Sequence, residues 1–449
     1  MARLFGLRPE PVERCRVLEI GCGDGVNLMA SSLVLPGAAF RGIDLSGAAI
    51  RRGRRMVRET GLKRVRLVQG DLAALDSGWG TFHYVVAHGL YSWVPVEVRE
   101  ALLAGIRQVL APNGVAFVSY SVYPGAYLRQ MAREMAVMFG GRVALGAIAA
   151  AREWLEVARG LDTGPAVYRA VLADEAVDML RRDDGALFHD DLASTNQPCY
   201  FRDFIGRAEA HGLQYVSEAD GFGAEPGPDR IGREQYTDFL VGRRFRQTLL
   251  CHAGMAVASA PDSGALQGCF VGGPVNAGVV EADGRVAYAN RTGARVVTGN
   301  AAECRVLDAV GQAWPAYVPA GKFGDEVLGL FAAGMLDIRT VAPPVGKFGK
   351  RPVRPEASPL ARWQAVRGTS VASLHHMEVL LGSSSLREVL SLADGTRTRA
   401  GLTRELLTLY PGETRERVAA AVKQHLEELW EYGLLSVGQR AQQRLHVHG

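Results

Sequence analysis

A glycine-rich turn, Leu18-Glu19-Ile20-Gly21-Cys22-Gly23-Asp24-Gly25, indicates the fold class, because it joins a short apolar run to a helical pattern. The run is CRVLEI, residues 15–20, and the helical pattern covers residues 26–35. Glycine in the joining turn lets the backbone reach unusual dihedral angles and approach a ligand closely. A dinucleotide fingerprint, G-x-G-x-x-G, would need its third glycine where Val26 stands. A nicotinamide-dependent oxidoreductase is therefore not indicated.

The segments beyond this turn alternate between strand and helix patterns. Helices are predicted after Ser46, a plausible N-cap, and over residues 96–110. Such alternation favours an α/β fold in which a parallel sheet carries helices on both faces. Ligands bind at the carboxyl ends of the strands in these sheets, which is where the glycine turn is expected. The further strands are predicted at 39–45, 65–69, 82–87 and 115–120.

The spacing E-x-G-x-G-x-G, from Glu19 to Gly25, resembles motif I of the class I S-adenosylmethionine (SAM) methyltransferases. In that family the glycine backbone packs beside the methionine part of SAM, and the acid orders the loop and the cofactor's amino end. The resemblance implies a Rossmann-like, seven-stranded domain that uses S-adenosyl-L-methionine and releases S-adenosyl-L-homocysteine. The alternative is a glycine-rich turn that binds another nucleotide.

Two further acids stand where a methyltransferase needs them. Asp44 ends the second strand in GIDLS, and its carboxylate can accept hydrogen bonds from both ribose hydroxyls. Asp71 follows the third strand in QGDLAAL, where it can accept from the adenine amine while the Leu72 N–H reaches a ring nitrogen. The alternatives are a dipole-stabilised acid at a helix N-terminus and an ordinary loop aspartate. The expected cofactor residues are Glu19, Gly21, Cys22, Gly23, Gly25, Asn27, Asp44, Leu45, Asp71, Leu72 and His88.

Aromatic residues follow the fourth and fifth strands, in AHGLYSWVP (87–95) and SYSVYPG (119–125). Both segments are expected to leave the sheet beside the methyl group, where aromatic faces can hold an ammonium group. The alternative is that these rings cover the adenine or fill the core. A lone histidine such as His88 is more often a hydrogen-bonded structural residue than a base. The expected substrate-binding residues are Tyr91, Trp93, Tyr120 and Tyr123, and the expected catalytic residues are His88, Tyr91 and Tyr120.

The strings HGLYSWVP (88–95) and LAPNGVAFVSYSVYPG (110–125) resemble one bacterial group of methyltransferases. This group joins a class I domain to a methyltransferase regulatory domain and includes the rickettsial protein lysine methyltransferases. The group commonly reads close to SYNTYPG where this chain has SYSVYPG (119–125), so Ser121 and Val122 replace its Asn-Thr pair. Its members usually also carry a segment ahead of ARLFGL that helps cover the cofactor. Strings resembling its regulatory domain are HDDL (189–192), NQPCYF (196–201), HGLQY (211–215) and QYTDFL (235–240).

Three domains are expected on this basis. Residues 1–140 form the SAM-binding domain, residues 141–262 a mostly helical regulatory domain, and residues 263–449 a winged-helix-like region. In the last region, Val306–Ile338 and Glu405–Ser436 each close a helix with glycine before an apolar strand, which is the habit of winged-helix modules. Their basic residues form no groove-reading helix, so a protein contact is favoured over nucleic acid.

Composition is that of an ordinary globular protein of 449 residues, with 48% hydrophobic and 22% charged residues and a formal net charge of +4. No apolar run approaches the ~18 residues of a membrane span, and no secretion signal core is visible at the N-terminus. The six cysteines form no C-x-x-C pair, so neither a disulfide scaffold nor a zinc site is indicated. Reduced thiols in the cytoplasm are the default expectation, with no metal.

Methyl transfer from a sulfonium is an in-line displacement, so positioning can supply much of the catalysis without a base triad. A lysine acceptor must lose its proton, which burial favours, whereas a carboxylate needs no base. We expect a SAM-dependent methyltransferase acting on a protein or peptide, with lysine as the first choice. The alternatives are methyl ester formation on a ribosomally made peptide, a small-molecule acceptor, and a non-catalytic SAM-binding protein. A dimer is possible.

Overall fold

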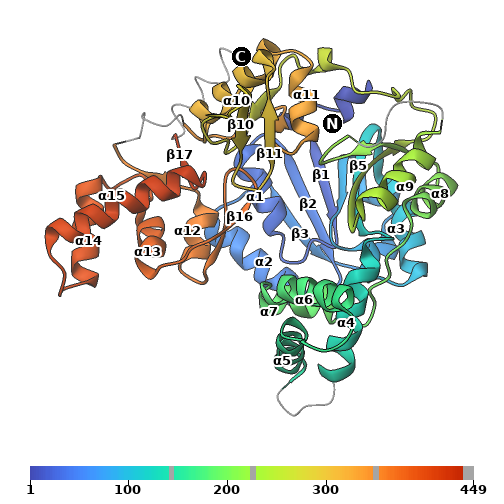
Figure 1. Cartoon of the computed structure of the whole chain (residues 1–449), viewed down its shortest axis with the longest axis horizontal. Helices are drawn as coiled ribbons and strands as arrows, with labels where there is room; N and C mark the ends of the chain where they lie inside the picture. Colours follow the sequence, from blue (N-terminus) through green and yellow to red (C-terminus); the bar gives the residue numbers. More distant parts are fainter. Residues whose placement is uncertain (141–145, 223–228, 347–352, 438–449) are drawn as a thin grey trace. The chain divides into compact units, whose positions relative to one another are not determined.

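The computed structural model describes residues 1–140, 146–222, 229–346 and 353–437 (Figure 1). Two compact units are distinguished, one within Leu72–Ser259 and one made of Ala2–Asp71 together with the described residues from Ala260 onward. No helix in the described ranges is long and apolar enough to cross a membrane. The expected domain boundary at residue 141 lies outside the described residues.

One sheet of seven strands has the order β3-β2-β1-β4-β5-β7-β6. Its first five strands confirm the predicted α/β fold. β1 pairs in parallel with β2, β2 with β3, and β4 with β5. β7 (Phe245–His252) instead runs antiparallel to both β5 and β6. The remaining strands are β1 (Arg16–Ile20), β2 (Ala39–Asp44), β3 (Val65–Gln69), β4 (Phe82–Ala87), β5 (Leu110–Ser121) and β6 (Leu213–Glu218).

The half of the sheet that carries the glycine turn, which we call the glycine-turn half, is built from β1–β3 with two helices, α1 (Val26–Val34) and α2 (Gly47–Thr60). Ser46 caps α2 as predicted, since its side chain accepts from the Ala49 N–H at 3.3 Å. The helix lies close to the loop that follows β1. A Cβ at Gly53 would stand 2.1 Å from the carbonyl oxygen of Asp24, so only glycine allows this approach.

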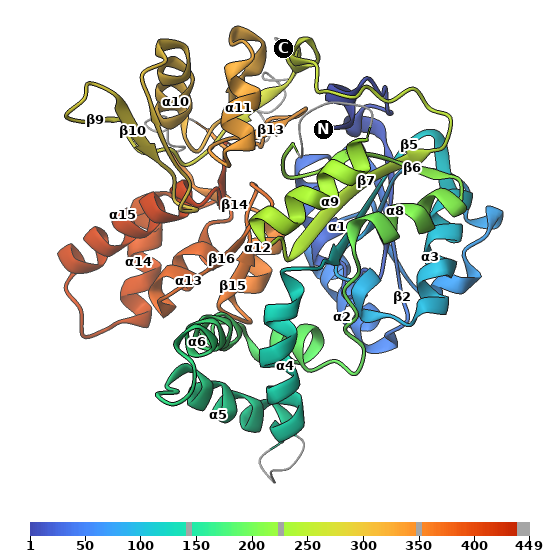
Figure 2. The same ribbon diagram turned by 45° about the vertical axis from the view of Figure 1, so that its right-hand side comes forward.

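Three helices in the other unit form a bundle, seen together in Figure 2. Alanine and leucine side chains of these helices, with Met179 and Leu187, make a small core of their own. The prediction of helices in the segment assigned to the regulatory domain is thus confirmed for α5 and α6. The helices are α4 (Ala126–Gly140), α5 (Ala147–Arg159) and α6 (Ala166–Leu180).

β6 and β7 come from the segment that the sequence assigned to the regulatory domain, and in the structure they complete the seven-stranded sheet. Helices α8 (Phe201–Ala210) and α9 (Arg230–Val241) accompany them. The difference has a physical reason: helices α4 to α6 stand between β5 and β6 in the sequence, and antiparallel pairing between strands so far apart leaves no local pattern. α3 (Val96–Val109) joins β4 to β5.

The C-terminal residues of the second unit form two modules. In the first, β8 (Phe270–Gly272) pairs between β12 (Val318–Pro319) and β13 (Asp337–Arg339). The second has a core of residues from Ala357 to Leu435, including the fully buried Trp430. Its elements are α12 (Pro359–Ala365), β15 (Ser370–Ala372), β16 (Glu378–Leu380), α13 (Ser384–Leu392), α14 (Arg399–Leu409), α15 (Arg415–Glu431) and β17 (Leu435–Ser436).

Candidate functional site

The glycine turn between β1 and α1 depends on a left-handed backbone at three alternate positions. Gly21, Gly23 and Gly25 have φ angles of 73°, 56° and 79°, which residues with a Cβ rarely adopt. At Gly25 a Cβ would also stand 2.6 Å from a methyl group of Leu67 on β3. The turn therefore exposes backbone rather than side chains at the end of β1, as the sequence predicted.

Glu19 lies on β1 and is buried, with 4% of its surface exposed. One carboxylate oxygen, Oε1, accepts from the Nδ2 group of Asn27 at 2.7 Å. The other, Oε2, is buried and has no hydrogen-bond partner among the described residues. Burial raises the pKa of this carboxyl to about 7, and the Asn27 hydrogen bond opposes that shift. A buried acceptor left open in this way is costly unless a ligand meets it.

Asp44, at the end of β2, holds the glycine turn in place. Its Oδ2 accepts from the Gly23 N–H and its Oδ1 accepts from the Ser46 N–H, both at 2.8 Å. An ionised carboxylate offers about four lone-pair positions, so two remain for a ligand. The sequence predicted Asp44 as a ligand residue but missed its bond to Gly23, which fixes the loop as well.

The remaining expected cofactor residues lie at strand ends with varied exposure. Cys22 is buried, and burial raises the pKa of its thiol. Leu45 is 72% exposed beside Asp44, and an exposed apolar side chain there can cover a flat ring. Asp71, two residues after β3, is exposed, and Leu72 is partly buried. The two compact units divide between these residues, with Asp71 in one unit and Leu72 in the other.

These residues fit the group that motif I implies. The open Glu19 oxygen suits an ammonium group, because an ionised acceptor strengthens a hydrogen bond from a cationic donor. The free lone pairs of Asp44 suit neighbouring hydroxyl groups. Together they match the amino end and the ribose of S-adenosyl-L-methionine. No group of three or more His, Cys, Asp or Glu side chains that could hold a metal occurs among the residues described.

His88 follows β4 and belongs to the other unit. Its Nδ1 lies 2.9 Å from the hydroxyl oxygen of Ser119, which also accepts from the Gly89 N–H at 2.9 Å. The ring stands edge-on to Phe245, and desolvation lowers the pKa of His88, so the imidazole is neutral at pH 7. This geometry is that of the hydrogen-bonded structural histidine that the sequence left open as the alternative.

Tyr91 and Tyr120 are fully buried rather than exposed to an acceptor. Tyr120 stacks on Phe204 with ring centroids 4.0 Å apart, and Tyr91 meets the same ring edge-on at 5.0 Å. Burial raises the pKa of both phenols. Their packing agrees with the core-filling alternative, and a catalytic or substrate-binding role for either stays a prediction that this burial counts against.

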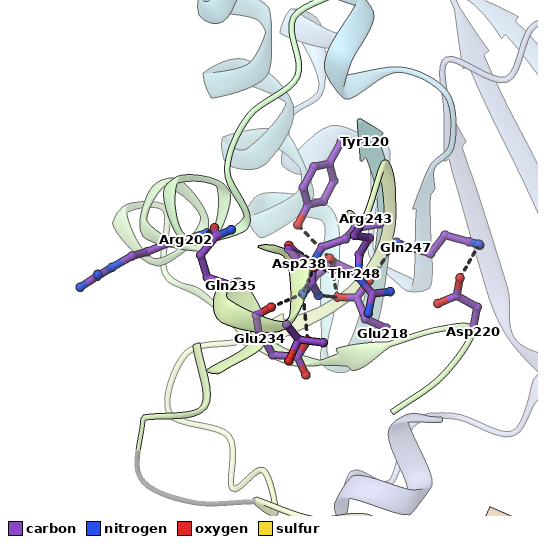
Figure 3. Close-up of polar contacts among 12 residues, drawn as sticks. Tyr120, Arg202, Glu218, Asp220, Glu234, Gln235, Asp238, Arg243, Gln247 and Thr248 are labelled. Atoms are coloured by element: carbon purple, nitrogen blue, oxygen red, sulfur yellow. Dashed lines mark hydrogen bonds and ion pairs between the residues drawn. The ribbon is translucent and has the colours of Figure 1, made fainter. Parts of the chain in front are cut away.

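The Tyr120 hydroxyl is linked through Thr248 to a buried cluster of charged side chains (Figure 3). That hydroxyl lies 2.9 Å from the Thr248 hydroxyl, which in turn donates to Glu218 at 3.0 Å. Glu218 also accepts from Arg246, whose side chain is buried on β7. Sequence reasoning missed this arginine, because it stood in a basic string whose burial no local pattern reveals.

Arg246 is neutralised by more than one acid. Its guanidinium donates to Glu234 at 2.9 Å and to Asp238 at 2.8 Å, both on α9, and it covers the face of Phe201 at 3.8 Å. Glu218, Glu234 and Asp238 each have at most 2% of their surface exposed. The cluster therefore fastens α9 and β6 to β7.

Tyr123 belongs to an exposed aromatic group that we call the tyrosine cluster: Tyr123, Tyr127, Tyr200 and Phe239. Tyr123 stacks on Tyr127 with centroids 4.1 Å apart and meets Tyr200 at 5.4 Å, and Tyr200 stacks with Phe239 at 5.9 Å. More than half of the surface of Tyr127 and of Phe239 is exposed. Of this cluster the sequence identified Tyr123 alone. Trp93 instead donates its indole N–H to the Asp190 carbonyl at 3.0 Å.

Three family models match parts of the chain. They describe a methyltransferase domain over residues 17–114, a predicted methyltransferase regulatory domain over 183–223, and a PKMT C-terminal winged helix domain over 354–434. The first contains the glycine turn and Asp44, and the last coincides with the second C-terminal module. The predicted winged-helix character is thereby confirmed for residues 354–434.

Two relatives are uncharacterized proteins of Rickettsia prowazekii, each 33% identical to the chain. The match to RP789 covers 57% of this chain and 49% of RP789, and the match to RP028 covers 46% of this chain and 85% of RP028. The chain thus spans about half the length of RP789. A solved structure of PKMT2 from Rickettsia typhi in complex with AdoHcy has a TM-score of 0.82 and 24% identity, covering 97% of this chain and 96% of that one. It shares the fold.

Proposed function

This chain belongs to the class I S-adenosylmethionine-dependent methyltransferases that carry a methyltransferase regulatory domain, and from that premise we propose that it methylates a lysine side chain of a protein or peptide. The cofactor is S-adenosyl-L-methionine. When bound, it supplies an electrophilic methyl group. The residues of this chain have to hold the cofactor, place the acceptor amine and exclude water.

Glu19 and Asp44 are proposed to hold the two polar ends of the cofactor. Glu19 Oε2 would accept from the amino group, and Asp44 would accept from the ribose hydroxyls with the lone pairs that Gly23 and Ser46 leave open. Leu45 and Asp71 would meet the adenine. The likeness of fold to PKMT2, which binds AdoHcy, supports this assignment.

The tyrosine cluster is the observation that favours a lysine as the acceptor. Its exposed aromatic faces attract an ammonium group, with an energy of about 0.5–2 kcal/mol per contact depending on how dry the site is. Burying the ammonium also lowers its pKa, so the proton leaves to solvent before the nitrogen lone pair attacks. His88 is not needed as a base in this scheme and keeps its bond to Ser119.

A protein acceptor is favoured over a small metabolite by the accessory structure. The helical bundle and the two C-terminal modules make up more of the chain than the sheet and its helices, and a metabolite would need no such platform. PKMT2 matches this chain over the same modules. The winged-helix match over 354–434 therefore supports a contact with a macromolecule.

The test is intact-mass analysis of synthetic peptides incubated with the full chain and SAM. One peptide library carries lysine at its centre, and a matched library carries arginine there and acidic residues elsewhere. We expect a gain of one or more methyl groups on lysine that survives mild alkali. Phe239→Ala should reduce the rate, whereas Val167→Ala, at another exposed apolar position, should not.

A methyl group that mild alkali removes would contradict lysine methylation and indicate a carboxylate ester. Tight SAM binding without transfer to any peptide or protein extract would indicate a binding protein instead.

A further inference from the structure

A short turn in the second C-terminal module has an unusual backbone. It joins β15 to β16, and we call residues 374–377 the histidine turn. Its residue His376 has a φ of 61°, and it is the one non-glycine residue with positive φ that the described ranges contain. Left-handed backbone at a residue with a Cβ is unfavourable and persists only where its surroundings impose it.

The surroundings of the histidine turn hold it from several sides. The ring of His375 is buried against Trp314, with centroids 4.5 Å apart, and its Nε2 lies 2.9 Å from the Pro315 carbonyl oxygen. Arg339 donates to the His375 carbonyl at 2.7 Å, and the Leu374 N–H donates to the Gly433 carbonyl at 2.9 Å. These anchors fix the residue before His376 and leave the His376 side chain on the outside.

The His376 side chain reaches the cofactor loop. Its Nε2 lies 2.5 Å from Oδ1 of Asn27, in the first turn of α1, and Asn27 Nδ2 donates to Glu19 Oε1 at 2.7 Å. An amide accepts through its oxygen and donates through its nitrogen, so the bond from His376 selects the orientation in which Asn27 faces Glu19 with its N–H. The chain His376–Asn27–Glu19 thus leaves Glu19 Oε2 as the open acceptor.

An independent contact holds the same module against α2, which belongs to the glycine-turn half of the sheet. Glu59 Oε2, at the end of α2, accepts from the Trp363 indole N–H at 2.7 Å and from Arg367 at 3.1 Å. Trp363 lies on α12, and α12 packs along α2. The His376–Asn27 bond is therefore accompanied by a second polar contact, at Glu59, between the module and the helices that follow β1 and β2.

We propose that His376 is a positioning residue of the cofactor site, supplied by the winged-helix module, which orients Asn27 and through it Glu19 toward the amino end of SAM. The inference rests on the proposed placement of SAM at Glu19 and Asp44. It assigns the C-terminal module a part in cofactor affinity in addition to any contact with an acceptor protein. The strained backbone is then the means by which the turn presents this side chain.

The test is SAM titration calorimetry and steady-state kinetics on His376→Gly. Glycine suits the left-handed backbone, so the variant should fold with a melting temperature close to that of the wild type without SAM. Loss of one hydrogen bond to the site should raise the Kd and the KM for SAM roughly fivefold to tenfold, with kcat changed less than about twofold. His376→Asn, which tolerates this backbone, should bind SAM more tightly than His376→Gly.

Two controls separate positioning from a general effect on folding. Met377→Ala changes an exposed neighbour in the same turn and should leave the Kd unchanged. In Asn27→Ala, adding His376→Gly should cost little further affinity, since the bond is already absent.

SAM affinity in His376→Gly equal to that of the wild type would overturn the inference while leaving the cofactor site intact. Additive losses in the double variant would overturn it as well. If the wild type itself failed to bind SAM, the assignment of Glu19 and Asp44 would fail, and the inference with it.

Discussion

Glu19 combines a buried carboxyl, a single amide partner and an open oxygen. Its folded pKa of about 7 lies above the unfolded value of about 4.5, because burial disfavours the ionised form. Between these two values the folded state binds more protons than the unfolded state, so the free energy of unfolding falls as pH rises through that window. A bound cation would favour ionised Glu19 and reverse this cost.

Glu19→Gln is expected to remove that pH dependence. Without SAM, the wild type should lose about 2–3 kcal/mol of stability between about pH 4.5 and 7 that the variant does not lose. Urea unfolding across this range measures the difference. In calorimetry, SAM affinity should rise with pH through about 7 in the wild type and less in Glu19→Gln. Parallel stability profiles for the two proteins would contradict the assignment.

Asp44→Ala removes an acceptor for the Gly23 and Ser46 N–H groups and the proposed ribose contact together. We expect SAM affinity to fall by about a hundredfold or more, because two ligand hydrogen bonds to a charged group are worth about 1.5–3 kcal/mol each. Asp24→Ala is the matched control, since Asp24 in the same loop pairs only with the largely exposed Arg52 in the described structure. Calorimetric affinity unchanged in Asp44→Ala would remove Asp44 from the site.

The sequence predicted the glycine turn and the places of Glu19 and Asp44 at strand ends, but not how the aromatic residues after β4 and β5 pack; the part of Glu19 and Asp44 in holding SAM stays a proposal. Glu19 and the three glycines lie within one pattern over residues 19–25, and Asp44 ends the next predicted strand, so spacing and strand order point to them. Tyr120 is held by Thr248, which is 128 residues away, and no local signal distinguishes its burial from exposure. For the same reason Tyr123 was identified without the partners that make it part of a cluster.

Among the elements, β1 to β5 were predictable because each is a short apolar run and because helical patterns follow β1, β2 and β4. β6 and β7 were not, since they pair antiparallel across a helix and lie far from β5 in the sequence. Arg246 and its carboxylates join β7 to β6 and α9 in addition to the pairing of the strands. Charge burial of this kind is invisible in composition, because the same residues are usually solvated.

Arg246→Ala should therefore destabilise the fold strongly. The substitution leaves Glu218, Glu234 and Asp238 buried without their common cation, and breaking such a cluster costs about 3–5 kcal/mol. Arg285→Ala is the control, because its pair with Asp283 is exposed and should be worth about 0–1 kcal/mol. Urea unfolding of both variants measures the two losses in the free energy of unfolding. A loss below about 1 kcal/mol in Arg246→Ala would show that the cluster does not fasten β7.

For the whole molecule, the sequence pattern predicted a winged-helix-like region and favoured a protein contact for it, but it did not reveal the contacts of this region with the N-terminal helices. Its contacts join residues 304 and 349 positions apart, namely Glu59 with Trp363 and Asn27 with His376. Neither pair lies in a motif, so only the folded chain brings them together. The C-terminal module is thus connected to the SAM-binding elements through a few polar side chains.

Glu59→Ala tests whether these contacts hold the module in solution. The substitution removes the acceptor of both Trp363 and Arg367, so amide hydrogen exchange should become faster in α12 and at the end of α2 together. Glu416→Ala, an exposed change on α15, should leave both segments unchanged. Because His376 belongs to the same module, Glu59→Ala should also weaken SAM binding, by less than His376→Gly does. Faster exchange in α12 alone, with SAM affinity intact, would show that the module and the cofactor loop are energetically independent.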